Sequence, residues 1–135
     1  MNGAHGFDSA DAQPTGLAAP WTLRQYSFLG DGERGALVGP RGELVWLCAP
    51  RWDSEAVFGS LIGAAGEYRV GPRDDWNVWG GYYEDGSLVH VNRWTTANSI
   101  IECREALAMP AAADRLVLLR RVRAVHGQAR VRMLL

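Results

Sequence analysis

Three consecutive residues, Arg51, Trp52 and Asp53, are the side chains of this chain best suited to hold a small polar ligand. An indole face can stack on the apolar face of a sugar ring, while a guanidinium and a carboxylate can bond its hydroxyl groups. The two charged residues can equally pair with each other or with nearby backbone, and Trp52 can fill the core. The residue types make this loop the best candidate in the chain for contact with a substrate, but loops also need side chains that fix them, and the purely structural alternative is favoured.

The residues on either side of this loop predict the elements that position it. Two apolar runs, 36–38 and 44–48, are separated by Gly39-Pro40-Arg41-Gly42 and predict a β-hairpin that leads directly into the loop. After the loop, Ser54 can cap one short helix near residues 54–62.

The rest of the chain predicts further short strands with turn signals between them. They cover residues 67–70, 88–95, 100–107, 115–125 and 130–134, and no internal repeat is present. The segment 115–125 also fits helical spacing, but its β-branched residues favour a strand paired in a hairpin with 130–134. The predicted fold is therefore all-β, an antiparallel β-sandwich.

Five short motifs between Tyr26 and Leu135 give the chain a resemblance to a known family. They are Leu29-Gly30-Asp31-Gly32, Val45-Trp46-Leu47-Cys48, Pro50-Arg51-Trp52-Asp53-Ser54, Arg93-Trp94-Thr95-Thr96 and Arg120-Arg121-Val122. In these motifs and their order the chain resembles the amino-terminal domain of glycoside hydrolase family 15, the glucoamylase and trehalase-like enzymes. Two residues depart from the family pattern: Trp52 stands where phenylalanine is usual, and Glu105 stands where aspartate is commoner.

The resemblance implies a β-supersandwich followed by an (α/α)6 barrel that carries both catalytic glutamates of an inverting hydrolysis of α-glucosidic bonds. Nothing in this chain matches the barrel, so we expect no catalytic residue here and no activity of the chain alone. The expected partners are the catalytic barrel of the same polypeptide and, in the parent enzyme, an α-glucoside such as a maltooligosaccharide or trehalose. The domain would support the barrel and edge the sugar pocket with residues 51–53.

Two other functions remain open at this point. The domain could be an autonomous carbohydrate-binding module that uses Trp52 or the aromatic residues Trp76, Trp79, Tyr82 and Tyr83, although core packing is the commoner role of such a cluster. It could also be an oligomerisation domain, because the chain stops within the apolar run 131–135 and would leave an unpaired sheet edge free for self-association.

Composition excludes several classes of function. The formal net charge is -1, which gives no basic field for nucleic acid. No run of residues has the length and hydropathy of a membrane span, and no secretory signal precedes residue 20, so we expect no membrane association and a cytoplasmic location. Cys48 and Cys103 are isolated in apolar runs and are expected to be buried reduced thiols; no metal site and no cofactor is expected.

Acidic pairs at Asp74-Asp75 and Glu84-Asp85 fall in predicted turns, where exposure would not raise a carboxyl pKa as general acid catalysis requires. Residues 1–20 are poor in apolar side chains and predict a disordered leader. Residues 21–135 then form the amino-terminal β-sandwich domain, expected to be truncated and to lack its catalytic barrel.

Overall fold

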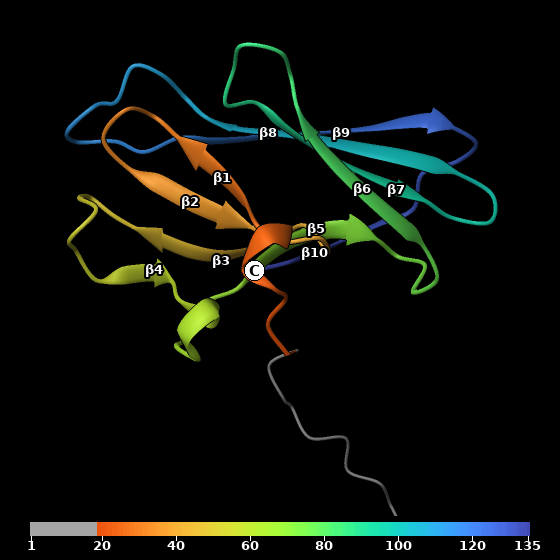
Figure 1. Ribbon diagram of the computed structural model, residues 1–135, viewed down its shortest axis with the longest axis horizontal. Coiled ribbons are helices and arrows are strands. Elements are labelled where there is room, and N and C mark those ends of the chain that lie inside the picture. The colour runs from red at the N-terminus through yellow and green to blue at the C-terminus, as the bar shows by residue number, and fades with distance from the viewer. Residues whose placement is uncertain (1–18) are drawn as a thin grey trace, which may run out of the picture.

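A computed structural model describes residues 19–135 as two antiparallel β-sheets packed face to face (Figure 1). The all-β, antiparallel sandwich predicted from the sequence is thereby confirmed. Most of the predicted disordered leader, residues 1–18, lies outside the described residues.

The first sheet contains the predicted hairpin that leads to residues 51–53. Its strands are β1 (Ser27–Gly30), β2 (Gly35–Val38), β3 (Glu43–Cys48), β5 (Tyr68–Pro72) and β10 (Val131–Leu134) in that spatial order, with β4 (Ala56–Phe58) paired to β3. The turn from β2 to β3 closes through hydrogen bonds that the amide of Gly39 donates to Glu43 O (2.8 Å) and that of Gly42 donates to Gly39 O (2.9 Å). The hairpin prediction is therefore confirmed.

The second sheet is built from strands that are neighbours in the sequence. These are β6 (Val78–Tyr83), β7 (His90–Thr95), β8 (Ile100–Leu107) and β9 (Leu118–His126). The ambiguous segment 115–125 is thus mainly strand, as its β-branched residues favour. Two short 3-10 helices, η1 (Leu23–Gln25) and η2 (Ser60–Ile62), complete the described elements.

Two local predictions need correction. The helix expected near residues 54–62 is reduced to the 3-10 turn η2, because Ala56–Phe58 instead adds strand β4 to β3. The hydroxyl of Ser54 accepts the amide of Arg51 (3.1 Å), so it closes the preceding loop and does not cap a helix. The segment β10 does not pair with β9 in a hairpin; it crosses to the other sheet and pairs with β5, where Met133 lies opposite Val70.

The core lies between the sheets in two clusters. One joins Leu29, Ala36, Val38, Leu44 and Leu47 of the first sheet to Leu107 of the second, and the other joins Val70 to Trp94, Ile101 and Cys103. The predicted buried free thiols, Cys48 and Cys103, are confirmed. Among residues 19–135, no helix is long and apolar enough to cross a membrane.

Candidate functional site

The predicted loop of Arg51, Trp52 and Asp53 connects β3 to β4 and is strongly exposed. The exposed fraction of Trp52 is 72%, so the alternative in which this indole fills the core is wrong. The guanidinium of Arg51 donates to both carboxylate oxygens of Asp53, with Nε 3.0 Å from Oδ1 and Nη2 3.1 Å from Oδ2. The alternative in which the two charges pair with each other is therefore present, and it leaves the indole face of Trp52 uncovered.

The base of this loop is anchored by a buried ion pair that sequence reasoning did not identify. Asp31 and Arg34 approach to 2.7 Å with side chains only 1% and 3% exposed. Arg34 also donates to the carbonyl oxygens of Pro50 (3.3 Å) and Arg115 (3.0 Å). The Leu29–Gly32 motif thus supplies Asp31, which holds the Arg34 side chain that bonds the residue before Arg51, and the loop has a fixed base below an exposed tip.

The charge of Asp31 is stabilised in the folded protein. Burial by itself would raise the pKa of this carboxyl, but the backbone amides of Arg34 and Glu33 and the guanidinium of Arg34 all donate to it or attract it. Their combined effect lowers the pKa of Asp31 below its ordinary value. The ion pair is therefore present at neutral pH.

The aromatic residues between 76 and 83 differ in their burial and contacts. Trp79 packs against the buried cluster of Val70 and Trp94, as the core prediction expects. Trp76 lies in the connection from β5 to β6 and is 92% exposed, and Tyr82 on β6 is 48% exposed, so for these two residues the core prediction is wrong. Tyr83 bridges the sheets, because its hydroxyl accepts the amide of Phe28 (2.7 Å) and donates to the carbonyl of Phe28 (3.0 Å).

A chain of buried polar contacts crosses the second sheet. The indole of Trp79 donates to Asn92 Oδ1 (2.6 Å), and Asn92 donates to Glu105 Oε1 (2.7 Å). Glu105 pairs with Arg120 at 2.7 Å, and Arg120 donates to the carbonyl of Gly42 in the first sheet (2.9 Å). Burial raises the pKa of Glu105 in this environment. The chain of contacts holds the two sheets together from the inside.

Two of the three buried glutamates among residues 19–135, Glu43 and Glu105, are held by contacts within the fold. Glu43 accepts the indole N–H of Trp21 (2.9 Å) and the amide of Arg41 (2.7 Å), and burial raises its pKa. Glu105 is held by Asn92 and Arg120 as described above. Within residues 19–135 no group of three or more His, Cys, Asp or Glu side chains is placed to hold a metal ion. The carboxylates of Glu43 and Glu105 therefore stabilise the packing of the fold.

The family model for trehalase-like N-terminal domains matches residues 15–134. The chain belongs to this family. The resemblance to the amino-terminal domain of glycoside hydrolase family 15 is thereby confirmed.

The curated relatives are much longer than this trehalase-like N-terminal domain. The chain is 34% identical over 116 residues to the trehalase of Mycobacterium tuberculosis, covering 76% of this chain and 17% of that protein. It is 36% identical over 104 residues to the trehalase of Mycolicibacterium smegmatis, covering 71% and 16% respectively. A shorter match, 43% identical over 54 residues, links it to Trehalase 1 of Sulfolobus acidocaldarius, with 39% of this chain and 10% of that protein covered. No solved structure matches the chain.

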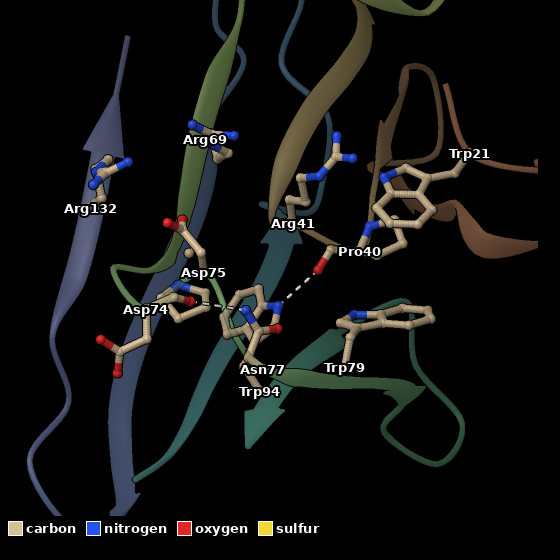
Figure 2. A pocket seen from close by; sticks show the side chains of 12 residues that line it. Trp21, Pro40, Arg41, Arg69, Asp74, Asp75, Asn77, Trp79, Trp94 and Arg132 are labelled. Carbon is tan, nitrogen blue, oxygen red and sulfur yellow. Dashed lines mark hydrogen bonds between the residues drawn. The ribbon is translucent and has the colours of Figure 1, made fainter. Parts of the chain in front are cut away.

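The trehalase-like domain has a second surface feature, at the other end of β3 from the loop. A pocket of about 350 Å³ lies beside the β2–β3 turn and the β5–β6 connection (Figure 2). Sequence reasoning treated residues 39–42 only as a turn and residues 74–75 only as solvated acids. It missed the pocket because its walls come from segments far apart in the chain.

Proposed function

We propose that this chain is the amino-terminal β-sandwich domain of a larger trehalase-type glycoside hydrolase, and that it does not catalyse hydrolysis alone. The observation that carries the proposal is the family match over residues 15–134, together with trehalase relatives of which the chain covers 16–17%. The parent enzyme would hydrolyse α-glucosidic bonds, with its catalytic carboxylates on the barrel that follows this domain. The domain would support that barrel.

The proposed contact with the sugar pocket is the loop of Arg51, Trp52 and Asp53. Two properties support it. The side chains of Arg51 and Asp53 are 74% and 46% exposed, and the fold makes no use of the Trp52 indole in its core. The base of the loop is nevertheless fixed by Arg34 through Pro50, and a fixed base holds a contact in one place at a low entropic cost.

A chimeric enzyme tests this role. The domain would replace the matching 116-residue segment of the Mycobacterium tuberculosis trehalase, and kcat/KM for trehalose would be measured. We expect Trp52→Ala to lower kcat/KM at least about tenfold, which corresponds to a loss of about 1.4 kcal/mol of transition-state stabilisation. Trp76→Ala is the matched control, since this tryptophan is also exposed but belongs to another connection. Equal activity of the two variants would contradict the proposal.

The isolated chain provides an independent test of the missing catalytic machinery. We expect no hydrolysis of maltose, maltotriose or trehalose by the 135-residue chain. Turnover that persists after rigorous purification would show that catalytic residues are present here. Sequencing the coding frame downstream of Leu135 would show directly whether a barrel follows.

The exposed Trp52 also favours a second function, an autonomous carbohydrate-binding module. Saturable binding of glucose oligomers to the isolated chain, lost in Trp52→Ala, would support this function. Self-association is favoured by the edge strand β10, where Val131, Met133 and Leu134 are 42%, 67% and 40% exposed. Light scattering at high protein concentration tests it, and a strictly monomeric mass would exclude it.

We also propose a cytoplasmic location. Cys48 and Cys103 are both free and buried, which fits a reducing compartment. Cell fractionation with an antibody against the domain would test this location, and recovery in the culture medium would contradict it.

A further inference from the structure

The pocket beside the β2–β3 turn has the size and the walls of a small-molecule site (Figure 2). Its volume of about 350 Å³ lies within the range of roughly 300–1,000 Å³ that is usual for ligand pockets. The β2–β3 turn contributes Arg41, and the segment before η1 contributes Trp21. The second sheet contributes Trp79 and Trp94. The β5–β6 connection contributes Asp74, Asp75 and Asn77, and β5 and β10 contribute Arg69 and Arg132.

The aromatic walls of the pocket are fixed by hydrogen bonds within the protein. Trp94 donates its indole N–H to Pro40 O (2.7 Å), the bond drawn in Figure 2, and Trp79 donates to Asn92 Oδ1 (2.6 Å). Trp21 donates to Glu43 Oε1 (2.9 Å). Because all three indole N–H groups are satisfied, these rings need no polar partner from a ligand. Trp21 and Trp79 supply apolar surface that is already in place, whereas Trp94 is only 1% exposed and packs against Trp79 from the core.

Four of the five charged side chains at the pocket are in the opposite condition, while the fifth, Arg69, pairs with Glu67 at 3.8 Å. Within residues 19–135, no side-chain hydrogen bond or ion pair engages the guanidinium of Arg41 or Arg132, or the carboxylate of Asp74 or Asp75. Arg41 is held in position by the face of Trp21, with its Cζ 4.5 Å from the ring centroid. These free donors and acceptors contrast with Arg51 and Asp53, which bond each other.

This combination selects one chemical class of ligand. The three arginines and two aspartates at the pocket present charges of both signs, so an anion or a cation meets repulsion beside its attraction. A neutral ring that carries several hydroxyl groups can donate to the carboxylates, accept from the guanidiniums and place its apolar face on an indole. We propose that this pocket binds a neutral saccharide, at a site separate from the loop of residues 51–53.

The separation follows from the length of β3. The pocket lies at the Glu43 end of this strand, and the loop follows its Cys48 end. Six residues of extended chain span about 20 Å, so one small sugar cannot occupy both places. The inference goes beyond the proposed function and does not depend on the existence of a catalytic barrel.

The test is a titration of the 15N-labelled 135-residue chain with trehalose and with maltose, followed through the six tryptophan indole N–H resonances. Single Trp→Phe variants assign the resonances. We expect saturable shifts of the Trp21 and Trp79 signals, with those of Trp52 and Trp76 unchanged. The double variant Asp74→Asn/Asp75→Asn and the single variant Arg41→Gln should each weaken binding at least tenfold. Asp85→Asn, an exposed turn acid of the β6–β7 connection, is the matched control and should bind normally.

Three results would overturn the proposal. The first is the absence of any shift with either sugar in a chain whose amide spectrum shows it to be folded. The second is a shift of Trp52 in place of Trp21 and Trp79, which would place the sugar on the loop. The third is a shift caused by inorganic phosphate but not by the sugars, which would make the pocket an anion site. Failure of the loop in the chimeric trehalase would leave these resonances unaffected, so the two proposals fail independently.

Discussion

Glu105 on β8 and Arg120 on the neighbouring strand β9 form a buried ion pair within the second sheet, with 2.7 Å between carboxylate and guanidinium and side chains only 0% and 5% exposed. Asn92 donates to the second oxygen of Glu105, and Arg120 lies with its Cζ 4.5 Å from the centroid of the Tyr68 ring. Arg120 also reaches the carbonyl of Gly42. The pair therefore joins β8 and β9 to the turn of the opposite sheet.

Removing one charge of this pair is expected to destabilise the domain strongly. Glu105→Gln leaves the Arg120 guanidinium buried without a counter-ion, which costs about 3–5 kcal/mol of unfolding free energy. Urea denaturation measures this free energy. Asp53→Asn breaks the exposed pair with Arg51 and serves as the control, with an expected cost below about 1 kcal/mol.

The double variant Glu105→Leu/Arg120→Met separates the cost of an unpaired charge from the contribution of the pair. Because both charges are removed together, we expect it to be more stable than Glu105→Gln. A Glu105→Gln variant that unfolds at the same urea concentration as the wild type would show that water reaches this ion pair.

His90 is expected to make stability fall with acid. Its ring is 2% exposed and its Nε2 lies 2.8 Å from the hydroxyl of Ser27. Burial lowers the pKa of His90 to about 4, whereas an unfolded histidine titrates near 6.5. Between these values the unfolded chain binds the proton and the folded one does not. The contribution of the neutral His90 ring to the free energy of unfolding is therefore complete above pH 6.5. As the pH falls toward 4, the free energy of unfolding decreases by about 2–3 kcal/mol.

The difference between wild type and His90→Gln isolates this effect. The raised pKa values of Glu43 and Glu105 act in the opposite sense, because their folded forms bind protons more readily as the pH falls. They are common to both proteins and cancel in the difference. Unfolding free energies measured between pH 7 and pH 4 should converge for the two proteins at the acidic end. Parallel curves would mean that the His90 ring binds a proton equally well in the folded and unfolded states.

The outline of the fold was predictable because period-two alternation and glycine turns are local signals. Alternation does not say which face of a strand is buried when both faces are mixed. On β7 the buried inner face carries His90, Asn92 and Trp94, so its polar residues form the core network. The partner of β10 was also not predictable, because pairing with β5 depends on contacts across sixty residues of chain.

In the candidate site, too, the local features were predictable from the sequence and the long-range contacts were not. The loop of residues 51–53 is contiguous, so its chemistry is readable from the sequence. The Arg34 anchor below it and the pocket at the other end of β3 are assembled from separate segments. Only the tertiary structure brings these side chains together.

The two tryptophans Trp52 and Trp94 should differ sharply in their effect on stability. Trp94 is 1% exposed and its indole N–H bonds Pro40 O, so Trp94→Ala opens a cavity and costs about 3–5 kcal/mol. Trp52 is 72% exposed, so Trp52→Ala should change stability by less than about 0.5 kcal/mol. Urea denaturation of both variants measures these costs. A large loss in Trp52→Ala would reassign this residue to the packing of the fold.

Gly42 and Gly63 have nearly the same backbone conformation in different surroundings, which makes them a matched pair. Their φ angles are 74° and 76°, in the left-handed region. A Cβ at Gly42 would lie 1.9 Å from the carbonyl oxygen of Val70, whereas a Cβ at Gly63 meets nothing within 4 Å. Both alanine variants carry the conformational cost of about 1–2 kcal/mol. Only Gly42→Ala adds the clash, which must also displace the hydrogen bond from the amide of Val70 to Gly42 O (3.1 Å).

We therefore expect Gly42→Ala to cost at least about 2 kcal/mol more than Gly63→Ala, as overpacked positions typically do. Denaturation in urea gives both values, and a common slope of free energy against urea would confirm that the unfolded states are comparable. The clash at Gly42 would displace the β2–β3 turn, which also contains Pro40 and Arg41. Loss of the Arg41–Trp21 contact in Gly42→Ala, seen as a shift of the Trp21 indole resonance, should accompany the loss of stability. Equal costs for the two glycines would mean that the β2–β3 turn can move away from β5 without penalty.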